Sequence, residues 1–342
     1  MRYIYRRLLF YLLALWVAIT LNFAIPRLIP GNPAEGFLAT HRQQFEGVPN
    51  ALQIVQAELG VSHAPLLVQY WQYIVNLAHG NLGISTSYYP VSVATVIAQS
   101  LPWTIFLVGL AVVLAFIIGT GIGVLAAWRR GGLLDNVLPP LTLLTSSFPF
   151  FFLALLLLYV LGFQFKWFPL GHAYADGTVP RFNLSFIGDA LYHAILPALS
   201  IVIVTIGGWL LGMRNTMINT LSEDYISMAQ ARGLRDRRVM LAYAARNAIL
   251  PQITGFALSL GYLVGGQVLI ETVFSYPGVG YTLFQAIGNQ DYPLIQTLLL
   301  IITVCVLVAN LITDLLYTRL DPRARAAYPC LLRRTRRCND NR

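Results

Sequence analysis

The chain has 342 residues, of which 57% are hydrophobic and only 11% are charged. Soluble domains carry about 25% charged residues, so this composition excludes an ordinary soluble enzyme and indicates a membrane protein with several spans. The formal net charge is +9, but no base-reading module accompanies it, and nucleic-acid binding is therefore not expected.

Apolar runs without charge, long enough to cross a bilayer, recur along the chain. A spanning helix needs roughly 17–25 such residues. We predict an all-α membrane protein with six spans, at residues 8–25, 101–128, 137–163, 191–213, 247–270 and 292–313. Three prolines, Pro139, Pro140 and Pro149, predict a kink in the third span, because proline removes a backbone donor.

The start of the chain has two readings. Arg2, Arg6 and Arg7 precede the first apolar run, as they would in a secretory signal peptide. The run is too long for a typical signal, however, and no small-residue cleavage site follows it. We expect residues 1–29 to stay as an N-terminal anchor helix.

Arginine placement predicts the topology. Segments 1–7, 129–136, 214–246 and 319–342 contain 3, 2, 6 and 8 arginines, which is 19 of the 23 basic residues. Positive charge is retained on the cytoplasmic side of a membrane, so both termini should be cytoplasmic.

The segment after the first span, residues 30–99, should then lie outside the cytoplasm. It shows helical patterns at 51–59 and 66–77 and has no charged residue after Glu58. Its aromatic residues suit an amphipathic contact surface. The candidates are Tyr70, Trp71, Tyr88 and Tyr89. Capping the outer ends of the spans is an equally open role for this segment.

Residues 224–251 form a charged amphipathic island between two apolar runs. Small residues at Ala229 and Gly233 would let a partner approach closely, and Tyr225 and Met228 would add apolar contact. We predict a helix that docks a cytoplasmic partner. The candidate residues are Asp224, Tyr225, Met228, Ala229, Ala231, Arg232, Gly233 and Leu234.

Ionisable residues inside a membrane are candidates for function. Arg214 and Asp314 lie at cytoplasmic ends of spans, where pairing or snorkelling would satisfy them. Glu271 lies toward the outer end of the fifth span, and its role as a gate or as an interfacial carboxylate stays open. The gate or substrate-path candidates are Glu271, Phe274, Tyr276, Pro277 and Asp291.

No catalytic or metal site is predicted. The five histidines are scattered without metal-ligand spacing, and no nucleophile motif accompanies them. Cys305 lies inside the last span, while Cys330 and Cys338 lie in the basic tail. A membrane enzyme is therefore disfavoured.

Several motifs, in order, resemble those of the dipeptide, oligopeptide and nickel permease family of ABC importers. They include Pro30-Gly31-Asn32-Pro33, Ala229 with Gly233, Glu271-Thr272-Val273-Phe274, Tyr276-Pro277-Gly278, Asp291-Tyr292-Pro293 and Leu320-Asp321-Pro322-Arg323. The departures are Asn32, Met228, Gln230 and the arginine-rich tail beyond Ala327.

The resemblance implies the transmembrane domain of a type I ABC importer. It implies a second homologous permease, two cytoplasmic ATPases that use ATP and Mg, an extracytoplasmic solute-binding protein, and no cofactor bound by this chain. The core permease domain would cover residues 100–320, with the cytoplasmic coupling loop at 214–251 and a basic cytoplasmic tail at 321–342. The location would be the cytoplasmic (inner) membrane of a bacterium or archaeon.

The substrate is less determined. The resemblance favours peptides, and oligosaccharides or nickel complexes remain alternatives. A secondary transporter is the alternative from another class, but the inverted repeats and midplane charges expected of one are not seen.

Overall fold

The computed structural model is helical, and a single isolated bridge, between Ile84 and Ser92, is the only β-pairing in the residues it describes. The predicted all-α fold is confirmed. The described residues are 2–28, 37–38, 50, 64–181, 183–261, 263 and 268–320. The turn at 30–33, the helical pattern at 51–59 and the tail at 321–342 lie outside them.

In the part of the chain that the structure describes, four helices are long and apolar enough to cross a membrane, and they confirm four of the predicted spans. They are α1 (Arg2–Leu28), α6 (Val93–Trp128), α9 (Leu184–Leu221) and α15 (Tyr292–Leu320). Both α6 and α9 begin before the predicted spans. At 1.5 Å per residue, the 36 residues of α6 reach about 54 Å, more than the roughly 30 Å of the hydrocarbon core, so its ends protrude.

The third predicted span is a bent pair. Helix α7 (Leu133–Ser147) is followed by α8 (Phe150–Leu157), which continues into the π-helical segment η1 (Leu158–Gln164). The two arms meet at 96°. Pro149 precedes the first residue of α8, so the bend lies at this proline rather than at Pro139 or Pro140, which α7 contains.

The fifth predicted span is not observed as one long helix. Helix α12 (Arg246–Gly261) has 16 residues, and α13 (Val268–Val273) follows a stretch that is mostly outside the described residues. Among the described residues, the structure therefore has four single spans and one bent span where the sequence predicts six.

The centre of the bundle is the contact between α6 and α9. Two glycines of α6 permit it, since a Cβ at Gly119 would lie 2.7 Å from Trp209 Cβ, and one at Gly123 would lie 2.7 Å from the Leu210 carbonyl oxygen. Gly121, between them, faces open space. Backbones that approach this closely are typical of small-residue packing in membranes.

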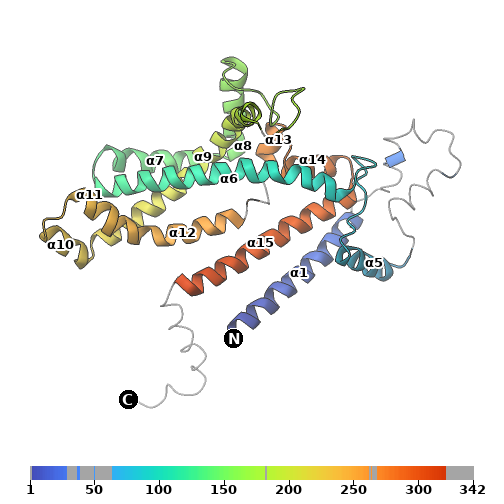
Figure 1. Ribbon diagram of the computed structural model, residues 1–342, viewed down its shortest axis with the longest axis horizontal. Helices are drawn as coiled ribbons and strands as arrows, with labels where there is room; N and C mark the ends of the chain where they lie inside the picture. Colours follow the sequence, from blue (N-terminus) through green and yellow to red (C-terminus); the bar gives the residue numbers. More distant parts are fainter. Residues whose placement is uncertain are drawn as a thin grey trace, which may run out of the picture.

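Helices α1 and α15 pack side by side and run in opposite directions (Figure 1). The beginning of α1 and the end of α15 therefore lie at the same end of the molecule. Helices α6, α7, α9 and α12 form the main body beside this pair.

Short helices close the two ends of the body. At one end are α10 (Asp224–Ala231), α11 (Asp236–Arg238) and the π-helical segment η2 (Val239–Ala245). At the opposite end are α5 (Leu66–Ala78) and α14 (Val279–Gly288) (Figure 1). The sites described below lie at these ends.

Candidate functional site

Helix α10 has an inward and an outward face. Ile226 and Ala229 are buried, and they pack with Met217 of α9 and with Val239 of η2. Met228 is 60% exposed and Tyr225 is 38% exposed on the other side. Ala229 therefore belongs to the chain's own core, because the apolar side of α10 packs against α9. The outward surface of α10 is formed by Tyr225 and Met228 instead.

Gly233 ends α10 in the left-handed region, with φ +73°, and its amide donates to the Gln230 carbonyl at 2.9 Å. A Cβ at this position would meet nothing within 4 Å. The chain therefore needs glycine here for its backbone conformation, which side chains disfavour. The sequence suggests that glycine is needed here so that a partner can approach closely. In the structure, the backbone conformation accounts for the glycine.

The remaining residues of the predicted docking set surround this turn. Asp224 lies in the first turn of α10, and Leu234 packs against the inner cluster while Ala231 is exposed. Arg232 is exposed together with three further arginines, Arg235, Arg237 and Arg238. The outward surface at this end is thus methionine and tyrosine beside an arginine cluster.

Helix α10 is joined firmly to the body of the protein. Asn247, near the start of α12, donates a hydrogen bond to the Tyr225 hydroxyl over 2.8 Å. The inner cluster also includes Val124 and Ala127 at the end of α6. Since close-packed interiors transmit displacement, a push on α10 would reach α6, α9 and α12 together.

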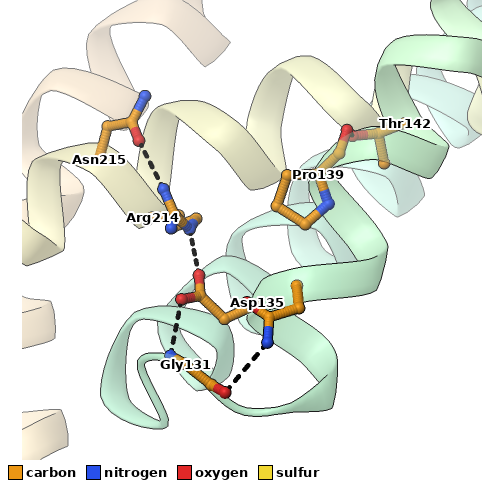
Figure 2. A network of polar contacts seen from close by, with 7 residues as sticks. Gly131, Asp135, Pro139, Thr142, Arg214 and Asn215 are labelled. Atoms are coloured by element: carbon orange, nitrogen blue, oxygen red, sulfur yellow. Dashed lines mark hydrogen bonds and ion pairs between the residues drawn. The ribbon is translucent and has the colours of Figure 1, made fainter.

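A second link lies where α7 begins. Arg214 of α9 donates to the Asp135 carboxylate over 2.5 Å, and the other carboxylate oxygen accepts the Gly131 amide at 2.8 Å (Figure 2). Asn136 donates to the Gly131 carbonyl. This network fastens the α6–α7 turn to α9. The sequence leaves pairing and snorkelling open for Arg214, and it does not identify Asp135, which lies in the arginine-rich segment 129–136, as its partner.

At the opposite end, Glu271 is fully buried and serves as an anchor. Its carboxylate accepts the Thr104 hydroxyl at 2.8 Å and the amides of Gly280 and Tyr281 at 2.7 and 3.1 Å. The Thr104 hydroxyl in turn accepts the Val279 amide at 2.7 Å. Glu271 therefore caps α14 and holds it on α6, as acidic groups favour helix N-termini.

Asp291 has a comparable role at the start of α15. It accepts the Leu294 amide at 3.2 Å as an N-cap, and it also accepts the Ser87 amide at 2.9 Å and the Ser85 hydroxyl. Asp291 is fully buried. It joins the loop before α6 to the α14–α15 junction, which the sequence could not show because Ser85 is 206 residues away.

The other gate candidates are also largely internal. Phe274 and Tyr276 are buried, and the Tyr276 ring meets Trp103 of α6 edge to face, with centroids 6.1 Å apart. Pro277 is partly exposed. In this conformation four of the five candidates, Glu271, Phe274, Tyr276 and Asp291, lie inside the fold and do not line an open path.

The four aromatic residues predicted to contact a solute-binding protein divide into two groups. Tyr70 bonds Thr20 of α1 at 2.8 Å, and Tyr89 packs against Phe37 with centroids 5.2 Å apart. Trp71 and Tyr88 are exposed. Partial burial raises the pKa of the Tyr88 phenol, and the nearby Tyr281 and Asp291 add to the increase, so Tyr88 presents a neutral hydroxyl. Only Trp71 and Tyr88 of this set offer exposed rings to another molecule.

Among the described residues, no group of three or more His, Cys, Asp and Glu side chains could hold a metal ion. The fold and these sites define a polytopic α-helical membrane protein that presents a firmly attached helix at one end of its bundle. Residues 119–326 match the family described as the inner membrane component of binding-protein-dependent transport systems. The chain belongs to this family.

Similar proteins have comparable lengths. The di/tripeptide transport system permease protein DppB of Pseudomonas aeruginosa is 34% identical over 89% of this chain and 93% of its own length. The oligopeptide transport system permease protein AppB of Bacillus subtilis is 32% identical over 94% and 98%. The glutathione transport system permease protein GsiC of Escherichia coli is 31% identical over 95% and 99%. The chain is thus an inner-membrane permease subunit with several spans.

Proposed function

We propose that this chain forms half of the translocation pathway of an ATP-driven peptide importer. The other half would be a second, homologous permease subunit, and two cytoplasmic ATPases and an extracytoplasmic solute-binding protein would complete the machine. Membership in a binding-protein-dependent transport family supports this set of partners. The observation that carries the proposal is the outward face of α10, with Met228 and Tyr225 exposed on a helix whose inner face packs against η2 and belongs to a buried cluster shared with α6, α9 and α12.

The α10 face suits an ATPase as its partner for two reasons. Exposed Met228 is a flexible apolar side chain that adapts to an irregular cleft. The buried contacts of Ile226 and Ala229 would pass a movement of that cleft to α9 and η2. The exposed arginines beside Gly233 would add charged contacts at the rim.

ATP hydrolysis is assigned to the partner subunits. A P-loop needs a lysine that reaches the β- and γ-phosphates, and the only lysine of this sequence, Lys166, is followed by Trp167 in a predicted outer loop. This chain would bind neither ATP nor Mg and no other cofactor. The proposal fails if the purified chain, free of ATPase subunits, binds ATP specifically.

The orientation follows from the arginines. With both termini and α10 on the cytoplasmic side, 19 of the 23 basic residues would be cytoplasmic. The common location of the beginning of α1 and the end of α15 supports this arrangement (Figure 1). The opposite end, with α14 and the loop at residues 85–91, would then face the binding protein, and Tyr88 of the loop and Phe284 of α14 are exposed aromatic residues there.

The buried carboxylates define a second part of the proposal. The hydrogen bonds of Glu271 and Asp291 would make α13, α14 and the start of α15 move as one unit with α6. A gate at this end would then open by movement of the whole unit. Loss of either carboxylate should uncouple the movement of this unit from ATP hydrolysis, without changing which peptide is carried.

Peptides are the proposed substrates because the relatives are named for di/tripeptide, oligopeptide and glutathione transport. The test is uptake into vesicles that contain both permeases, both ATPases and the binding protein. We expect uptake of labelled peptides that requires ATP and the binding protein and persists when ion gradients are collapsed. Uptake of an oligosaccharide or a nickel complex with no peptide uptake would contradict the substrate, and uptake driven by an ion gradient without ATP would contradict the class.

A further inference from the structure

Helix α5 has an apolar stripe that is exposed among the described residues. None of its residues is buried. At 100° per residue, Leu67, Trp71 and Val75 lie on one stripe, and Leu67 is 82% and Trp71 67% exposed. Val68 lies beside them. Helix α5 has 13 residues, no charged side chain, and is too short to span a bilayer.

The other sides of α5 have different surroundings. One side holds Tyr70 and Tyr73, which contact Phe23 of α1 with centroids 5.1 and 5.7 Å apart. The remaining arc holds the amides of Gln72 and Asn76, both exposed. Going around the helix, the order is therefore α1 contact, exposed apolar stripe and polar arc. An amphipathic helix at a membrane surface has such an apolar stripe opposite polar residues.

The contacts with α1 fix the position of α5 along the apolar span of α1. Thr20, whose hydroxyl is 2.8 Å from that of Tyr70, lies five residues before Ile25, the end of the apolar span. Five residues correspond to about 7 Å along a helix, so Tyr70 reaches below the end of the span. Arg27, just beyond the span, donates to Gln69 at 3.3 Å. These two contacts hold α5 beside the end of the apolar span of α1.

We propose that α5 lies in the membrane interface and inserts Leu67, Trp71 and Val75 among the lipids, with Gln72 and Asn76 toward water. The occupant of the stripe is the lipid that already surrounds α1, whose Leu13, Trp16 and Leu21 are exposed. A binding protein that leaves between transport cycles would return the stripe to water, and soluble surfaces seldom carry contiguous apolar patches of this kind. Helix α5 would thereby position the outer segment at a fixed height on the membrane.

Site-directed spin labelling tests this assignment. Cys305, Cys330 and Cys338 are replaced by serine, and single cysteines are placed at Leu67, Trp71 and Val75 on the stripe and at Gln72 and Asn76 on the polar arc. Leu13 of α1 is the lipid reference, and the exposed Asp176 is the water reference. The complete transporter is reconstituted in vesicles of phosphatidylethanolamine and phosphatidylglycerol, and collisions with oxygen and with a water-soluble nickel chelate are compared.

We expect labels at positions 67, 71 and 75 to favour oxygen severalfold over nickel, as at position 13, and labels at 72 and 76 to favour nickel, as at 176. Nickel preference at all five positions would overturn the proposal. Shielding of the stripe from both reagents would also overturn it, because a protein subunit would then be the occupant. If the stripe loses access to the nickel chelate only when loaded binding protein is added, the binding protein and not lipid covers the stripe.

Discussion

Thr104 of α6 and Glu271 of α13 are joined by a hydrogen bond of 2.8 Å, although 167 residues separate them in the chain. The same threonine hydroxyl accepts the Val279 amide, so one side chain connects α6, α13 and the first turn of α14. Gly278 sits against this junction. A Cβ there would lie 2.4 Å from Glu271 Oε2 and from Thr104 Oγ1.

We predict that Gly278→Ala destabilises the protein by about 1–3 kcal/mol through overpacking of the junction. The measurement is the midpoint temperature of thermal unfolding of the purified protein, monitored as the fraction of protein that remains monodisperse. Gly288→Ala is the matched control, because a Cβ at Gly288 meets nothing within 4 Å. Equal transitions for the two variants would mean that the junction is not packed as described.

Thr104→Val should cost about 1–3 kcal/mol, because it keeps the shape of the side chain but leaves a buried carboxylate oxygen and the Val279 amide unpaired. In the assembled transporter it should also lower the ATP hydrolysis stimulated by loaded binding protein more than the basal hydrolysis. A proportional loss of both activities would show that Thr104 stabilises the fold without coupling the outer end.

The Asp135–Arg214 pair should show a direct coupling energy. We expect Asp135→Asn and Arg214→Gln each to destabilise the protein, and the double variant to lose less than the sum, with a coupling of about 0.5–3 kcal/mol. The check is a double-mutant cycle on unfolding midpoints. Arg129→Gln, an exposed arginine of the same turn, is the control and should change the midpoint little. Additive losses would contradict the pairing.

Gly233→Ala should cost roughly 1 kcal/mol, because φ is +73° at this residue and an L side chain is disfavoured there. Gly177, with φ +81° and also with open space around it, is a matched control in the loop between η1 and α9. Both variants should lose similar stability, but only Gly233→Ala should reduce copurification of the ATPases. Gly233→Asn should restore part of the association, since asparagine tolerates this conformation. Equal copurification with both alanine variants would remove Gly233 from the coupling site.

The sequence predicts the spans of α1, α6, α9 and α15 well, because length and absence of charge are properties of each segment alone. It does not predict that α6 and α9 begin before their apolar runs. Ser92 and Asn183 cap the helices at these earlier residues, so each helix begins with more polar turns. A kink in the third span is predicted from its three prolines, but its location at Pro149 and its 96° angle depend on how α8 packs on α9.

The candidate sites illustrate the same limit. The location of helix α10 could be predicted, but the inward direction of Ala229 is set by packing with α9 and η2. Glu271 left two roles open in the sequence, because its partners Thr104 and Gly280 come together only in the fold. Asp135 was missed since nothing in its own segment indicates that Arg214 lies within reach.

The central claim is that the outward face of α10 contacts an ATPase, and crosslinking from Met228 tests it most directly. A benzophenone label is attached to Met228→Cys in a variant without native cysteines, and the complete transporter is irradiated in vesicles. Leu13→Cys, exposed on α1, is the control. We predict an adduct with an ATPase subunit from position 228 and none from position 13. A transporter that hydrolyses ATP and imports substrate but yields no ATPase adduct from position 228 would contradict the account.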